Sequence, residues 1–287
     1  MPQTINTNLI SLNAQRNLGT SQSSLSTAMQ RLSSGMRVNS AKDDAAGLSI
    51  AERMDSQVRG MAVAGRNAND AISLSQTAEG ALGSVSSLFQ RMRELAVQSS
   101  NSTNSAADRT SLNQEFSQLS QEATRTLGGT QFNGQNILAT TTDSSFQIGA
   151  NNDTSIDRLT VAAFNWADNT GISTVLGTAV LSGTDVPTVQ ITDAASSQGA
   201  IASLDSAMAA INSPRAVFGA VQNRFSNIVA NLQVGVENQS AARSRIMDAD
   251  YAVETSNLSR ANILQQAGNA MVAQANQLPQ QVLALLR

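Results

Sequence analysis

The sequence contains neither cysteine nor histidine among its 287 residues. Without cysteine the chain has no disulfide and no thiol nucleophile. Without histidine it lacks the commonest general base and the commonest metal ligand, so the usual serine triads and HExxH zinc sites are excluded. We therefore predict that the chain is not an enzyme and that it needs neither a metal nor another cofactor.

Charge and aromatic side chains are also sparse. The formal net charge is −3, and aromatic residues make up 3% of the chain against 41% for all apolar residues. So small a charge provides no field that would favour nucleic acid. Small aliphatic side chains at regular spacing are typical of slender contacts between helices rather than of a large globular core.

Long apolar runs are missing as well. No stretch approaches the roughly 20 apolar residues that a membrane-spanning helix needs, so we expect no membrane span. The opening residues, MPQTINTNLISLNAQRN, lack a basic segment followed by an apolar one. We therefore expect no cleavable secretory signal.

Apolar residues recur every seven positions near both ends of the chain. This spacing is typical of coiled-coil stripes, and neither stripe can bury itself without a partner. The simplest partner for each stripe is the other end of the chain. The positions predicted to form this assembly seam are Leu18, Leu25, Leu32, Leu264, Met271, Leu278 and Leu285.

Apolar residues at steps of three and four predict three further helices. The first runs from about residue 47 to 99, and the second follows a polar turn at 101–105 and ends at Gly128-Gly129. The third covers roughly residues 201–232 and contains Pro214, which predicts either a kink or a new helix with Ser213 as its N-cap.

The periodicity changes over residues 130–192. TQFNG predicts a turn, and FQIG, RLTVAAF and TVQIT predict short strands. The predicted fold class is mainly α: a long coiled-coil-like helical bundle, or rod, formed by the N- and C-terminal segments, with a small β insert in the middle.

The run LSSGMRVNSAKDDAAGLSIA joins the first two predicted helices. Asp43 and Asp44 could be an acid pair, but no histidine, cysteine or third acid accompanies them. We predict instead a connector, in which Gly35 ends the first helix, Asp44 caps the next one and Asp43 favours its positive end.

Two other groups of residues leave alternatives open. The acidic pair in MDADY could be half a calcium loop, but the glycine and distal glutamate of an EF-hand are missing, which favours a turn or a helix start. In QRMREL, Met92 belongs to the apolar stripe, so Arg91, Glu94 and Leu95 are expected to point elsewhere. They form either a solvated face with an exposed leucine or an interaction surface.

Several long motifs resemble those of one family. RLSSGMRVNSAKDDAAGLSIAERM, RNANDAISLSQTAEGAL and TQFNGQNIL are similar to the N-terminal part of bacterial flagellin, and ARSRIMDADYAVETSNLSRANILQQAGNAMVAQANQLPQQVLALLR to its C-terminal part. The resemblance implies an inner helical domain of residues 1–44 with 243–287. It also implies a second helical layer of 45–165 with 195–242, and a short variable, surface-exposed insert at 166–194.

The resemblance also implies a function and partners. Flagellins are secreted through the flagellar type III export system and polymerise as a helical homo-oligomer, the extracellular filament used for motility. The implied partners are an export chaperone, the filament cap and junction proteins. The alternative is a hook–filament junction (hook-associated) protein, which shares the helical ends.

Recognition by host innate immunity is a further implication of the resemblance. Arg91, Leu95 and Glu115 match the residue types that flagellins present to a Toll-like receptor. At the C-terminal end, Val282, Leu285 and Leu286 match the tail that inflammasome receptors recognise.

Overall fold

A computed structural model describes residues 7–177 and 189–285, with side chains as far as residue 277. The fold is mainly α, as predicted, with two small hairpins in the middle. The chain divides into two compact units, residues 1–56 with 237–287 and residues 57–236. The described helices are α1 (Leu9–Ser34), α2 (Ala45–Ser100), α3 (Ala106–Gly129), α4 (Thr170–Leu176), α5 (Ala194–Met247) and α6 (Tyr251–Leu285).

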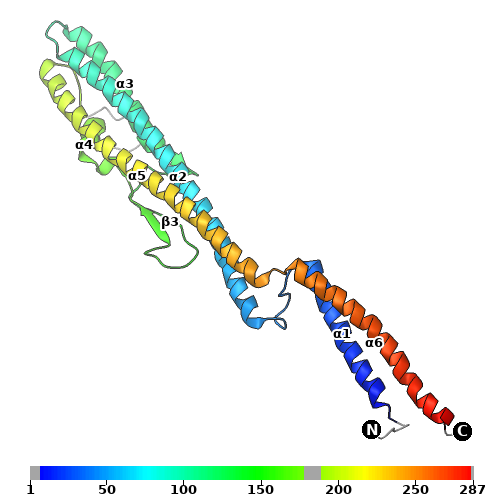
Figure 1. The fold of residues 1–287 in the computed structure, drawn as a ribbon. Coiled ribbons are helices and arrows are strands. Elements are labelled where there is room, and N and C mark those ends of the chain that lie inside the picture. The colour runs from blue at the N-terminus through cyan, green and yellow to red at the C-terminus, as the bar shows by residue number, and fades with distance from the viewer. Residues whose placement is uncertain (1–6, 178–188, 286–287) are drawn as a thin grey trace. The chain divides into compact units, whose positions relative to one another are not determined.

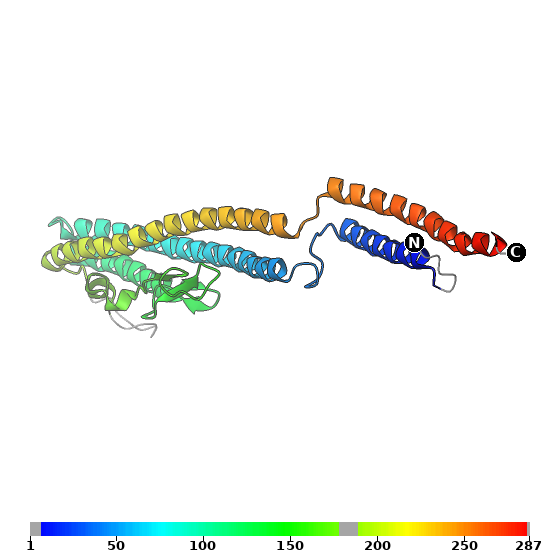
Figure 2. The ribbon, with the colours of Figure 1, turned by 60° about the horizontal axis from the view of Figure 1, so that its bottom comes forward.

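The first unit is built around α1 and α6, which lie side by side in both views (Figures 1 and 2). The Asn8 side chain starts α1 by accepting a hydrogen bond of 3.1 Å from the backbone N–H of Ser11. Gly35 ends α1 in the left-handed conformation (φ +70°), which glycine adopts without a Cβ penalty. The predicted end of the first helix is therefore confirmed.

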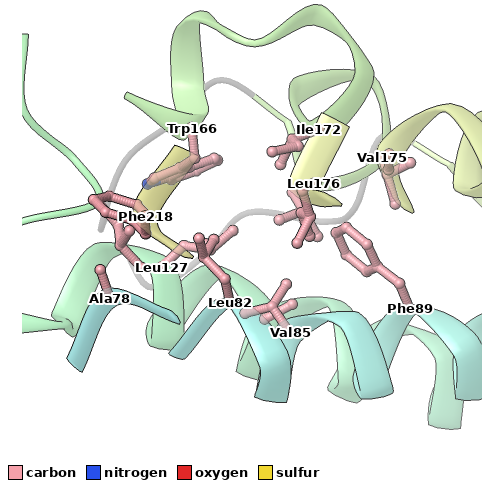
Figure 3. Close-up of a cluster of buried hydrophobic side chains, with 14 of the residues drawn as sticks. Ala78, Leu82, Val85, Phe89, Leu127, Trp166, Ile172, Val175, Leu176 and Phe218 are labelled. Carbon is pink, nitrogen blue, oxygen red and sulfur yellow. The ribbon is translucent and has the colours of Figure 1, made fainter. Parts of the chain in front are cut away.

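In the second unit, α2 is flanked by α3 and α5, and a single hydrophobic core runs between them. Figure 3 shows part of it: Leu82, Val85 and Phe89 of α2 face Trp166 and Leu176 from the segment between α3 and α5. Both Trp166 and Phe89 are fully buried. The long helix predicted from residue 47 to 99 is confirmed, because α2 extends from Ala45 to Ser100.

The other helix ends follow from local chemistry. Ser105 and Asp108 form a capping box that starts α3 after the predicted polar turn. Pro214 lies inside α5, which continues from Ala194 to Met247 without interruption. The alternative of a new helix capped by Ser213 is therefore wrong: burial of Ile211 and Phe218 on either side compensates for the hydrogen bond that proline removes.

The strands differ in extent from those predicted: β3 starts two residues before FQIG, and β4 covers only the first four residues of RLTVAAF. β1 (Gln131–Phe132) pairs with β2 (Gln135–Asn136), and β3 (Ser144–Gln147) pairs antiparallel with β4 (Arg158–Val161). The strand predicted for TVQIT is wrong over its described residues, 189–192. There the backbone N–H of Ile191 donates to the Asn113 side chain and its carbonyl accepts from Ser99, so side chains replace a neighbouring strand.

The segment expected as a surface-exposed insert at 166–194 is exposed at some of its described residues, such as Asp168 and Thr170, and packed against the core at others. This segment forms the 3-10 helix η1 (Trp166–Asp168) and α4, neither of which the sequence predicted. Large apolar side chains fold it back onto the core, and Ile172, Val175 and Ile191 are fully buried. Residues 178–188 lie outside the described part.

Candidate assembly interface

The contact between α1 and α6 follows a heptad pattern that places leucines of α1 against mostly small or polar residues of α6. Along α6 the buried and half-buried positions alternate at steps of three and four. On α1, Leu18, Leu25 and Leu32 are half-buried at seven-residue spacing. The α6 positions are Glu254, Leu258, Ala261, Gln265, Gly268, Val272 and Ala275.

The two helices come close where α6 has glycine. A Cβ built at Gly268 would lie 3.1 Å from Cδ1 of Leu18. Nearer the chain ends, the Ser11 hydroxyl donates to the Asn276 side chain at 2.7 Å, and the Asn8 amide donates to the Ala275 carbonyl at 2.7 Å. Leucines of α1 packed against small residues of α6, together with short polar contacts near the chain ends, therefore hold this pair together.

Other large apolar side chains of both helices are exposed to solvent. Leu264 is 50% exposed and Met271 is 60% exposed. The prediction of a buried seam is therefore wrong at these two positions: Leu264 borders the groove along α1 but stays half exposed, and Met271 is exposed to a larger extent. Other exposed apolar residues of the pair are Leu9, Ile10, Leu12, Met29, Tyr251, Val253 and Ile263. Leu278 and Leu285 lie on α6, and their side chains fall outside the described part.

Asp44 caps α2, as predicted. Its Oδ1 accepts a hydrogen bond of 2.8 Å from the backbone N–H of Gly47, and its carbonyl accepts one of 3.0 Å from Leu48. This satisfies N–H groups of the first helical turn, which have no partner within the helix. Asp44, the second residue of the acid pair, therefore has a structural role as a helix cap.

Asp43 organises the loop before the helix. Its carboxylate accepts hydrogen bonds from the backbone N–H of Asn39 and from the hydroxyl and N–H of Ser40, at 3.0–3.2 Å. These hydrogen bonds hold the pKa of Asp43 below its ordinary value, and the bond from the Asn39 N–H has the largest effect. The sequence placed Asp43 at the positive end of the helix; instead it closes a turn.

The two chain segments that leave the helical pair lie side by side. The backbone N–H of Arg37 donates to Met247 at 2.6 Å, and the N–H of Ala249 donates to Gly35 at 2.9 Å. The Arg37 guanidinium also donates to the Ile246 carbonyl at 2.8 Å. Val38 is buried beside Met247. Sequence reasoning missed this pairing, since a contact between residues 37 and 246 leaves no periodic signal.

The acidic pair of MDADY starts a helix. Asp250 Oδ1 accepts from the N–H groups of Ala252 and Val253, and Asp248 Oδ2 accepts from the Ser244 hydroxyl.

Within residues 7–177 and 189–285 there is no group of three or more His, Cys, Asp or Glu side chains that could hold a metal ion. In the same ranges, none of the helices combines the length and the hydropathy needed to cross a bilayer.

Arg91 links α2 to α3 on the surface of the second unit. Its Nη2 lies 2.9 Å from Glu115 Oε1, and its Nη1 lies 2.9 Å from Glu94 Oε2. Hydrogen bonds to Glu94 and Glu115 raise the pKa of Arg91 above its ordinary value. Arg93 makes a similar exposed pair of 2.7 Å with Asp205 of α5.

Leu95 does not join this surface. It is 1% exposed, so the expectation of an exposed leucine among charges is wrong. Because α3 and α5 both pack on α2, the apolar arc of α2 is wider than one stripe and includes Leu95 as well as Met92. The structure thus brings Arg91 and Glu115 together and buries Leu95 in the core.

A network at the far end of α2 was also missed by sequence reasoning. The buried Ser99 hydroxyl donates to the Ile191 carbonyl at 2.7 Å and lies 3.1 Å from the Ser197 hydroxyl. The Arg109 side chain donates to the Ser99 carbonyl at 2.9 Å. Serine in a buried stretch of helix was the only signal available in the sequence.

Comparison with known proteins decides the family. Residues 5–143 match the bacterial flagellin N-terminal helical region, and residues 201–286 match the bacterial flagellin C-terminal helical region. The chain is similar to flagellin of Halalkalibacterium halodurans, at 47% identity over 99% of both chains. The chain belongs to the bacterial flagellin family. The chain is also similar to flagellin of Xenorhabdus nematophila, at 43% identity over all of both chains.

A solved structure is also similar. The crystal structure of Bacillus cereus flagellin shares 36% identity over 58% of this chain and 88% of its own, with a TM-score of 0.48. Flagellins are structural proteins rather than enzymes, and they form the extracellular flagellar filament. Membership therefore identifies this chain as a structural subunit of the filament, and the exposed faces of α1 and α6 become candidate contacts between subunits.

Proposed function

We propose that this chain is exported as a flagellin monomer and polymerises through the exposed apolar faces of α1 and α6. The observation that carries the proposal is the exposure of Leu264 and Met271, which are half or more exposed in the single subunit. Scattered apolar residues are normal on a surface, but a row on two adjoining helices is typical of an interaction site. We extend the proposed seam to Leu278 and Leu285, which continue the same seven-residue spacing.

The proposed interface is tested by adding charge to it. In a double variant with Leu264→Asp and Met271→Asp, the purified chain should stay helical by circular dichroism but fail to extend filament seeds. A control with Gln266→Asp and Gln274→Asp adds the same charge to exposed polar positions of α6 and should still assemble. Filaments from the first variant at the concentration that suffices for the control would refute the proposal.

We further propose that the chain follows the flagellar type III route and uses an export chaperone, a filament cap and junction proteins. The full-length similarity to flagellins supports a filament subunit over the hook–filament junction alternative. Secretion by a strain lacking its own flagellin, with and without a functional flagellar export apparatus, tests the route. Equal secretion by both strains would count against it.

We also propose that a host Toll-like receptor recognises the surface around Arg91 and Glu115, with Leu95 supporting it from within the core. Support comes from their ion pair, which holds two exposed side chains in one arrangement. Arg91→Ala should reduce receptor signalling by about tenfold or more, as expected for a hot-spot arginine. The matched control is Arg93→Ala, which removes another exposed, ion-paired arginine of α2; an equal loss in both would contradict the assignment.

The proposed inflammasome-recognised tail consists of Val282, Leu285 and Leu286. Leu286 lies outside the described residues, and the side chains of the other two also fall outside them. Its support is the match of these apolar residue types to the family's tail. Leu285→Ala with Leu286→Ala should abolish inflammasome reporter activation by protein delivered to the cytosol, and full activation would contradict the proposal.

A further inference from the structure

Among the methionines that the structure describes, two are far more exposed to solvent than the others. Met29 of α1 is 57% exposed and Met271 of α6 is 60% exposed. By contrast Met92 of α2 is fully buried, and Met247 is 8% exposed. Both exposed thioethers lie on the helical pair of the first unit, outside the heptad contact that holds α1 to α6.

We propose that Met29 and Met271 are oxidation sites through which peroxide controls polymerisation of this chain. The link to polymerisation rests on the proposed function, in which the faces that carry these side chains contact other copies. The oxidation itself rests on exposure alone, because the susceptibility of a methionine follows the accessibility of its sulfur.

The chemistry needs only a peroxide or another two-electron oxidant. The sulfur attacks the terminal peroxide oxygen, a sulfur–oxygen bond forms and the oxygen–oxygen bond breaks. Hydrogen peroxide is reduced to water, and the thioether is oxidised to a sulfoxide. A thiol-dependent methionine sulfoxide reductase reverses the reaction and consumes two thiols.

The sulfoxide changes the contact in a definite direction. It converts a flexible apolar side chain into a polar one, which disrupts surfaces that depend on methionine packing. A contact that buries Met271 would have to desolvate the sulfoxide oxygen, which costs free energy that burial of the thioether does not. Folding of the isolated subunit is unaffected, since neither side chain packs in its core.

The first experiment maps oxidation in the monomer. The purified chain is treated with hydrogen peroxide, and sulfoxide is quantified at each methionine by peptide mass spectrometry over time. Met29 and Met271 should oxidise first and Met92 last. Oxidation of Met92 as fast as Met271 would overturn the assignment of the reactive sites.

The second experiment measures seeded assembly of the oxidised chain. In the chain that keeps both methionines, oxidation should raise the critical concentration for assembly by about tenfold or more, which corresponds to about 1.4 kcal/mol per subunit. A matched variant, Met29→Leu with Met271→Leu, keeps apolar side chains of similar size that cannot take up oxygen. It should assemble equally well before and after peroxide, and a reductase should restore the oxidised unmodified chain.

The outcomes separate this inference from the proposed function. Assembly of the oxidised chain at its original critical concentration would refute control by oxidation. Equal inhibition of the double-leucine variant would also refute it, because other methionines would then be responsible. If the untreated chain does not assemble at all, the proposed function fails and with it the control of polymerisation, while the order of oxidation still decides whether these are the reactive sites.

Discussion

Gly268 offers a direct test of how closely α1 and α6 pack. A Cβ at this position would meet Cδ1 of Leu18 at 3.1 Å and its Cβ at 3.7 Å. Alanine gains about 1 kcal/mol of helix propensity over glycine, but Leu18 must then move by a few tenths of an ångström, so Gly268→Ala should be nearly neutral. Leucine adds three further carbons between the helices, which costs about 1–3 kcal/mol in a packed contact.

The matched control is Gly19, which lies on α1 where an added Cβ would meet no described atom within 4 Å outside its own stretch of helix. Gly19→Leu should stabilise the helical pair by up to about 1 kcal/mol, because it gains propensity without a clash. Thermal unfolding followed by far-UV circular dichroism should therefore separate the two variants by about 2 kcal/mol, with Gly268→Leu the less stable. Equal or higher stability of Gly268→Leu would refute the close approach of the helices.

Three further substitutions or conditions test other parts of the structure. Asp44→Ala should destabilise the start of α2 by about 1 kcal/mol, measured by chemical unfolding, and an unchanged midpoint would argue against the cap. Lowering the pH below about 4 should open the loop at Asn39: the pKa of Asp43 is depressed in the fold, so its contribution is present above the unfolded pKa and lost as the pH falls through the folded one. The protection factor of the Asn39 amide, which is its exchange rate relative to the intrinsic rate at the same pH, should fall in that range. In Asp43→Ala, which removes the acceptor, it should be low at neutral pH too; protection that persists in the variant would contradict the assignment. Ser99→Ala should cost about 1–3 kcal/mol, because it removes the donor to the buried Ile191 carbonyl, and its neutrality would show that water replaces the hydroxyl.

The helices could be predicted because their causes are local. Apolar spacing along α2, the αL glycine at residue 35 and the capping aspartate at 44 each act within a few residues of the chain. Such signals survive in one sequence because helix starts and ends are decided by nearby hydrogen bonds. The fold class and the cap at Asp44 were predicted correctly for this reason.

The errors share a different cause. Leu95 was placed on the surface because a single stripe was assigned to α2, whereas α3 and α5 contact it on two sides. Leu264 was placed inside the α1–α6 contact because it is large and regularly spaced, whereas the helices meet over Gly268 and its small neighbours. Which helix lies against which face depends on residues far apart in the chain, and periodicity alone does not encode it.

The role of α6 in assembly is tested most directly by electron cryomicroscopy of filaments grown from the purified chain. We predict that Leu264 and Met271, half or more exposed in the single subunit, are buried there against helices of neighbouring copies. Gly268 should still pack on Leu18 of the same chain. Filaments in which Leu264 and Met271 remain exposed to solvent would contradict assembly through this face of α6.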